Sequence, residues 1–163
     1  MKKIVCLDTH ILIWGIQNSS SLGQEDMIQK AIDLLVWLQE NDYLVVVPSI
    51  VLAELLMRVP TELHMEVNRI LEKSFFIAPF DTLAASHFAS IWQKKKEDGA
   101  ISQLKEAKIL TREAIKFDCQ IVAIAIARNA EMIYSHDIGV QKFGEGLIQV
   151  QEIPFFPKQL SLF

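Results

Sequence analysis

Short apolar runs alternate with amphipathic stretches along the chain. Runs rich in β-branched and aromatic residues predict strands, and the intervals carry apolar residues at the three- and four-residue spacing of a helix. The predicted strands are residues 4–7, 43–47, 75–78, 132–135 and 147–151. The predicted helices are residues 25–39, 49–58, 62–73, 82–95, 103–117 and 118–128. Strands that alternate with helices in this way indicate an α/β fold, with a parallel sheet covered on both faces.

The first strand follows two lysines, which raises the question of an export signal (MKKIVCLDTHILIWG). A signal peptide needs an uninterrupted apolar segment of about 7–15 residues and then a small-residue cleavage site. Asp8 and His10 interrupt the apolar segment, and residues 14–17 offer no such site. The segment is therefore interpreted as a buried strand with Asp8 at its carboxyl end, the edge where ligands bind in open α/β sheets.

The composition predicts a single cytoplasmic domain over residues 1–163. The chain is 51% hydrophobic and 22% charged, which is ordinary for a compact protein with a real core. No apolar stretch reaches the roughly 18 residues of a membrane span. Cys6 and Cys119 match no metal or redox spacing and indicate two buried thiols in a reducing compartment. Residues 17–24 and 97–102 are interpreted as surface loops.

Net charge changes this picture only slightly. The formal net charge is −4, which argues against a protein that coats nucleic acid non-specifically. This net charge does not exclude an enzyme whose acidic residues are concentrated in its active site.

Acidic residues occupy four positions where the surrounding apolar sequence predicts burial. Asp8 ends the first strand and Asp137 ends the fourth. Glu54 lies within an apolar helix after the second strand, and Asp118 opens the buried helix before the fourth, where the helix dipole favours an anion. A carboxylate is rarely buried unless it is paired or bound to metal. If the first and fourth strands are neighbours, Asp8 and Asp137 face one crevice.

Carboxylates without accompanying His or Cys spacing favour a hard divalent cation, Mg²⁺ or Mn²⁺. Such an ion polarises a phosphoryl oxygen and generates or orients a hydroxide nucleophile, so the implied chemistry is hydrolytic phosphoryl transfer. A structural explanation stays open beside this one, because Asp8, Asp118 and Asp137 could each cap a helix. Glu54 has no such explanation, since an acid in the middle of a helix is not a cap.

The ordered set of motifs resembles the PIN-domain nucleases, of the kind found as VapC toxins of bacterial toxin–antitoxin pairs. The resemblance rests on residues 7–14 (LDTHILIW), 48–55 (PSIVLAEL), 118–125 (DCQIVAIA) and 133–137 (IYSHD), each of which carries one of the acids. Each motif alone is weak, and the specificity of the match comes from their order.

This resemblance implies a three-layer α/β/α sandwich with a five-stranded, mainly parallel sheet. It implies an endoribonuclease that depends on Mg²⁺ or Mn²⁺ and cuts single-stranded or structured RNA. It also implies a homodimer whose groove is blocked by an antitoxin. The implied catalytic, metal-binding acids are Asp8, Glu54, Asp118 and Asp137. Thr9 and Ser135 would be the hydroxyls that hold these carboxylates in place, with Ser135 standing where threonine is commoner.

The densest basic stretch contains Lys94, Lys95 and Lys96. Acidic residues are interleaved with the lysines and arginines that follow, which favours a solvated helix face. No aromatic residues alternate with them, so the stretch is not a stacking platform for bases. Contact of these lysines with RNA stays a hypothesis beside the solvated face.

Two other classes of protein fit the sequence less well. A haloacid-dehalogenase-like phosphatase also has an Asp after its first strand, but it needs a second Asp two residues later, and position 10 is His. A catalytically inactive PIN module that binds RNA or protein would have no reason to keep all four acids. His10 and His136 lie close to site acids in the sequence, where they could assist proton transfer or point away.

Overall fold

The computed structural model describes residues 1–106 and 111–156. Within these residues one sheet of five strands has the order β3-β2-β1-β4-β5, and every pair of neighbours is parallel. The strands are β1 (Ile4–Leu7), β2 (Leu44–Pro48), β3 (Phe76–Ala78), β4 (Met132–Tyr134) and β5 (Gln149–Gln151). The predicted parallel sheet is confirmed, and its strands all end at the same edge.

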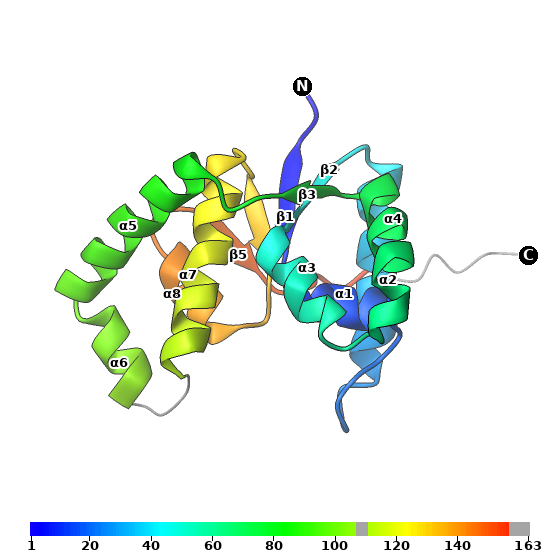
Figure 1. The fold of residues 1–163 in the computed structure, drawn as a ribbon, viewed down its shortest axis with the longest axis horizontal. Coiled ribbons are helices and arrows are strands. Elements are labelled where there is room, and N and C mark those ends of the chain that lie inside the picture. Colours follow the sequence, from blue (N-terminus) through cyan, green and yellow to red (C-terminus); the bar gives the residue numbers. More distant parts are fainter. Residues whose placement is uncertain (107–110, 157–163) are drawn as a thin grey trace, which may run out of the picture.

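Helices cover both faces of this sheet (Figure 1). They are α1 (Thr9–Gly15), α2 (Asp26–Glu40), α3 (Ser49–Leu56), the 3-10 helix η1 (Thr61–Leu63), α4 (His64–Ser74), α5 (Thr82–Glu97), α6 (Ala100–Glu106), α7 (Arg112–Ala127) and α8 (Ile138–Gly144). Helices α5, α6, α7 and α8 lie on one side, and α1, α2 and α4 lie on the other (Figure 1). Helix α3 contacts both α1 and α7. The result is the expected three-layer α/β/α sandwich.

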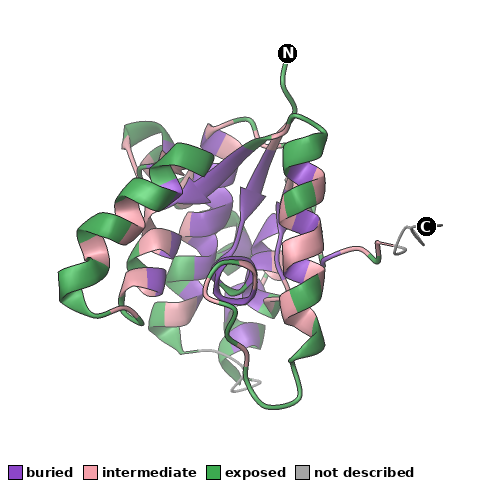
Figure 2. Cartoon of the chain, turned by 90° about the vertical axis from the view of Figure 1, so that its right-hand side faces the viewer, coloured by how far each residue is buried: buried purple, intermediate pink, exposed green. Residues whose placement is uncertain are grey.

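The hydrophobic core lies on both faces of the central strands. In β1, Val5, Cys6 and Leu7 are completely buried. Because helices cover both faces, the strand is apolar throughout and does not alternate. Figure 2 shows the buried sheet between helices whose outer faces are exposed. Cys6 and Cys119 are both buried and unpaired, as the sequence predicted.

The boundary between the two predicted helices 103–117 and 118–128 is wrong. Helix α7 begins one residue after Thr111, whose hydroxyl accepts a hydrogen bond from the Ala114 N–H at 3.2 Å, and it continues unbroken past Asp118. Asp118 is therefore an interior residue of a helix and not its N-terminal cap. Residues 107–110, which the first predicted helix included, lie outside the described residues.

The predicted loop 97–102 is also shorter in the structure. Only Asp98 and Gly99 separate α5 from α6. Gly99 has a φ of +81°, a left-handed conformation that glycine adopts without strain. This tight turn lets α6 begin at once and bury Ile101 and Leu104.

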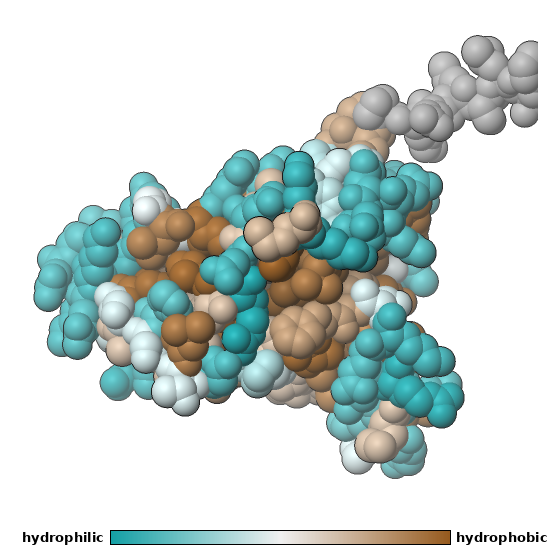
Figure 3. All heavy atoms as spheres, turned by 90° about the horizontal axis from the view of Figure 1, so that it is seen from above, coloured by the Kyte–Doolittle hydropathy of each residue, from teal (hydrophilic) through white to brown (hydrophobic). Residues whose placement is uncertain are grey.

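Apolar side chains also reach the surface. On the face shown in Figure 3, hydrophobic residues gather between two hydrophilic areas. Near the end of the described chain, the Phe156 ring lies 5.8 Å from that of Trp37, whereas Phe155 is exposed. The rest of the apolar segment, residues 157–163, lies outside the described residues. Across residues 1–106 and 111–156, no helix is long and apolar enough to cross a membrane.

Candidate active site

The pairing of β1 with β4 places Asp8 and Ser135 side by side. Leu7 pairs with Tyr134, so the next residue of each strand emerges at the same edge of the sheet. The Asp8 N–H donates to the Tyr134 carbonyl oxygen at 3.2 Å. The chain leaves β1 towards β2 and later returns on the other side of β1, which makes this edge a topological switch point. The first and fourth strands are thus neighbours, which is the condition under which Asp8 and Asp137 were expected to face one crevice.

The Asp8 carboxylate is buried and held by two donors. Its Oδ1 accepts from the Thr9 N–H at 2.6 Å, and its Oδ2 accepts from the Ser135 hydroxyl at 2.5 Å. Burial raises the pKa of Asp8, the two hydrogen bonds oppose that rise, and the nearby Asp137 adds to it. The side chain is thus fixed in position although its charge is poorly solvated.

Asp137 is held from two sides at the start of α8. Its Oδ1 accepts from the Gly139 N–H at 2.7 Å, and its own N–H donates to the Ser135 hydroxyl at 3.0 Å. Asp8 and Asp137 are therefore both helix caps. Capping does not exclude a second role, because an ionised carboxylate has about four acceptor positions on its two oxygens.

Glu54 comes to the site from the middle of α3. The Thr9 hydroxyl donates a hydrogen bond to its Oε2, which joins the first turn of α1 to α3. Thr9 is itself buried. Thr9 and Ser135 thus each donate to one of the acids that the sequence singled out.

Asp118 reaches the site from α7, and its carboxylate is only partly satisfied there. It is 7% exposed, and its Oδ2 is buried without a hydrogen-bond partner among the described residues. Burial, together with repulsion from Asp137, Asp8 and Glu54, raises the pKa of Asp118 to about 8. This mutual repulsion means that α7 brings Asp118 within electrostatic reach of the other three acids.

All four acids line one pocket of about 580 Å³, a volume typical of small-ligand sites. The other lining residues are Thr9, His10, Ile13, Met57, Arg58, Ala114, Phe117 and Ile121. The walls are therefore partly apolar, and the acidic groups sit between helices α1, α3 and α7. Arg58 is the only lysine or arginine among the described residues of this lining.

The chemistry of this pocket fits a hard divalent cation. In the described parts of the chain, no three His, Cys, Asp or Glu side chains are grouped closely enough to hold a metal ion as they stand. The pocket nevertheless offers carboxylate oxygens from four side chains, and one of these, Asp118 Oδ2, is buried without a partner. Bringing such oxygens onto a cation would relieve their repulsion and the cost of burying them.

The two histidines differ in their relation to the pocket. His10 lines it and lies 5.5 Å from the Trp14 ring. His136 is not in the lining; its Nε2 accepts from the Ile153 N–H at 3.1 Å, and its ring packs edge-on against Trp14 at 5.3 Å. Burial lowers the pKa of His136. His136 therefore attaches the segment after β5 to the site edge.

The three lysines at the end of α5 are not equivalent. Lys94 and Lys96 are exposed, whereas Lys95 is only 5% exposed and its Nζ donates to the Glu145 carbonyl oxygen at 3.1 Å. Lys95 thus does not present its charge to solvent, contrary to the expectation of a solvated lysine run. None of the three lines the acidic pocket.

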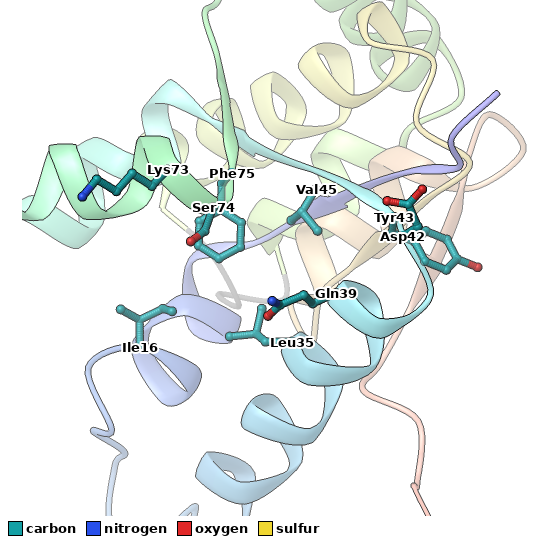
Figure 4. Close-up of a pocket in the computed structure, with 9 residues that line it drawn as sticks. All are labelled: Ile16, Leu35, Gln39, Asp42, Tyr43, Val45, Lys73, Ser74 and Phe75. Atoms are coloured by element: carbon teal, nitrogen blue, oxygen red, sulfur yellow. The ribbon is translucent and has the colours of Figure 1, made fainter.

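A second pocket lies beside the amino ends of β2 and β3, away from the acids (Figure 4). It measures about 410 Å³ and is lined by Ile16, Leu35, Gln39, Asp42, Tyr43, Val45, Lys73, Ser74 and Phe75. The Lys73 ammonium and the Asp42 carboxylate lie at opposite ends of it and do not converge (Figure 4). It has no cluster of reactive groups comparable with the acidic pocket.

Sequence reasoning missed Arg58 and Phe117, which both line the acidic pocket. Arg58 comes four residues after Glu54, and Phe117 directly precedes Asp118. Four-residue helical spacing from a site acid could have identified Arg58. Phe117 could not be identified because the helix was expected to begin at Asp118.

The fold and the acidic pocket together define a class of protein. The family model of the PIN domain matches residues 5–146, and the chain therefore belongs to the PIN-domain family, a class of nucleases. No curated protein is similar enough in sequence to count as a match.

Among solved structures, the chain is similar to VapBC2 from Rickettsia felis, described as bound to a DNA fragment from their promoter. The TM-score is 0.59 at 18% sequence identity, and the alignment covers 91% of this chain and 98% of that one. At this identity the likeness shows a shared fold over nearly the whole of both chains.

Proposed function

We propose that this protein is an endoribonuclease that depends on Mg²⁺ or Mn²⁺. The observation that carries the proposal is the unpartnered, buried Oδ2 of Asp118 in a pocket that also contains Asp8, Glu54 and Asp137. A purely structural role leaves this arrangement unexplained, because four carboxylates in one partly apolar pocket destabilise the protein unless a cation compensates them.

In this proposal, one set of residues binds the cation and another set orients the first. Asp8, Glu54, Asp118 and Asp137 would hold the cation, which supplies a Lewis acid for the phosphodiester and lowers the pKa of the attacking water. Ser135 orients Asp8 and the backbone of Asp137, and Thr9 orients Glu54. The hydrogen bonds that hold these groups keep the oxygens in place before substrate arrives.

The biological setting we propose is the toxin half of a toxin–antitoxin pair in the cytoplasm. Membership of the PIN-domain family and the likeness to the chain of VapBC2 support this setting. RNA as substrate, an antitoxin as partner and a homodimer are parts of the same proposal. Lys94 and Lys96 stay candidates for RNA contact, because both are exposed.

Cleavage of a mixed RNA pool by the purified protein tests this function. We expect cutting with Mg²⁺ or Mn²⁺, no cutting with EDTA, and no cutting by Asp8→Asn or Asp118→Asn. Both variants should keep the circular-dichroism spectrum of the wild type. Metal-independent cutting, or full activity in either variant, would refute the assignment. A protein that binds RNA without cutting it, and that Mn²⁺ does not stabilise, would instead be an inactive PIN module.

A further inference from the structure

The acidic pocket is also lined by residues that have no role in the proposed metal site. On α7, Ala114, Phe117 and Ile121 line the pocket together with Asp118, at helical spacings of three and four residues. Met57 and Arg58 also line the pocket, and they follow Glu54 at the same spacings, just past the end of α3. The pocket is therefore bordered by an aromatic ring on one helix and a guanidinium beside the other.

Phe117 has no evident structural role. Phe117 is 42% exposed and is not part of the hydrophobic core. Within residues 1–106 and 111–156 its ring pairs with no other aromatic ring. A single exposed aromatic residue means little by itself. This one lines the pocket next to the acid with the unpartnered oxygen, where a flat ring can stack on a planar group.

Arg58 is placed to meet a negative group. Within the described residues it is exposed and forms no ion pair, although it shares a pocket with four acids. A nucleic acid that approaches this pocket meets repulsion between its phosphates and the carboxylates. A guanidinium at the rim offsets that repulsion and can bind a phosphate through two parallel hydrogen bonds.

We infer that Phe117 stacks on one unpaired nucleobase and that Arg58 binds a backbone phosphate, so that the two residues position the strand over the acids. The inference rests on the nuclease function proposed above and adds the groups that hold the substrate. Stacking needs an exposed face of the base, and bases inside a duplex already stack on their neighbours. The pocket therefore selects a single strand, with one base on the α7 wall and a phosphate at the end of α3.

Binding is measured in the Asp118→Asn background, so that no strand is cut. The probe is a short oligoribonucleotide that carries one 2-aminopurine, whose fluorescence is quenched on stacking, and the same strand in a duplex is the comparison. Phe117→Leu keeps the apolar bulk without the ring, and Phe155→Leu is the matched control because Phe155 is exposed outside this pocket. We expect Phe117→Leu to lower single-strand affinity roughly 5- to 150-fold and to remove the quenching.

The role of Arg58 is tested by the salt dependence of the same binding. Arg58→Gln should lower the slope of log K against log [salt] by about 0.7, the value for one phosphate contact on a single strand. Arg58→Lys should restore most of the slope, and Arg69→Gln, at an exposed position on α4, should leave it unchanged.

Either of two results would overturn the inference. The first is equal affinity and quenching in Phe117→Leu and Phe155→Leu, and the second is an equal salt slope in Arg58→Gln and Arg69→Gln. Failure of the nuclease function gives a different result, because wild-type protein would then bind the strand in the expected way and not cut it with Mn²⁺.

Discussion

The Ser135 hydroxyl donates to Asp8 Oδ2 at 2.5 Å and accepts the N–H of Asp137 at 3.0 Å. One completely buried side chain at the end of β4 thus connects the acid that follows β1 to the acid that begins α8. The connection exists because β1 and β4 are neighbours in register, although Asp8 and Ser135 are 127 positions apart in the chain. Two acids of the site therefore share one hydroxyl.

Ser135→Ala should lower the free energy of unfolding by about 1–3 kcal/mol at pH 7, because a buried carboxylate and a backbone N–H each lose a partner. Urea denaturation measures the change. Ser86→Ala is the control, since Ser86 is exposed on α5 and its hydroxyl donates to the Thr82 carbonyl oxygen within its own helix. Equal stability of the two variants would mean that water replaces the Ser135 hydroxyl at no cost.

Thr9→Val should leave the fold intact and weaken metal-dependent cleavage roughly 10- to 100-fold. Valine keeps the shape of threonine but removes the hydroxyl that donates to Glu54 Oε2. Thr9→Ser should recover most of the activity because it restores the donor. The measurement is the rate of RNA cleavage with Mn²⁺ at saturating metal. Equal rates for the valine and serine variants would show that Glu54 does not depend on this hydrogen bond.

Without metal, the wild-type protein should lose stability as pH rises from about 4 to about 8. The pKa of Asp118 is near 8 in the folded protein and 3.8 is its ordinary value, so the folded state binds the extra proton throughout this interval. The free energy of unfolding therefore falls as pH rises. Asp118→Asn removes the titrating group and should be more stable than wild type by roughly 5 kcal/mol at pH 8, and similar to it at pH 4.

Urea denaturation in EDTA across this pH interval measures the difference. Glu72→Gln is the matched control, because Glu72 is an exposed acid on α4. A difference between Asp118→Asn and wild type that does not grow with pH would contradict the raised pKa.

Mn²⁺ should reverse this pH trend in the wild type. An ion that binds only the folded protein stabilises it by about 2.7 kcal/mol at a hundred times its Kd. The effect should grow with pH because the carboxylates must be ionised to bind the ion. Asp8→Asn and Asp118→Asn should lose most of it. The measurement is the Tm in a Mn²⁺ titration, and an equal rise of Tm in wild type and both variants would place the ion elsewhere.

The sequence predicted most of the fold because its strands are short, apolar and separated by amphipathic helices. The first strand was predicted at its observed bounds, Ile4–Leu7. The start of α7 could not be predicted in this way, because the helix is continuous through Phe117 and Asp118 while the pattern changes there from amphipathic to wholly apolar. The pattern changes because the second half of α7 is packed on more sides than the first half, and the helix itself is not interrupted there.

The four acids could be named from sequence because each interrupts an apolar segment. Their hydrogen-bond partners depend on strand order, which the sequence did not determine. The roles of Thr9 and Ser135 were implied only by the family resemblance. The burial of Lys95 was harder to predict, since a lysine among lysines is typical of a solvated surface. The spacing along the helix is the sequence feature that predicts this burial. Lys95 comes four residues after the buried Ile91 and so lies on the same face of α5.

Lys95 should contribute to stability in a way that its two neighbours do not. Its stem is buried, and its ammonium donates to the carbonyl oxygen of Glu145, the residue that caps the C-terminus of α8, where a cation is favourable. Lys95→Ala should lower the free energy of unfolding by about 1–3 kcal/mol. Lys94→Ala and Lys96→Ala should change it by less than about 0.5 kcal/mol, because both side chains are exposed. Urea denaturation of the three variants measures this, and an equal loss in all three would mean that the lysines act through their shared charge and not through the burial of one.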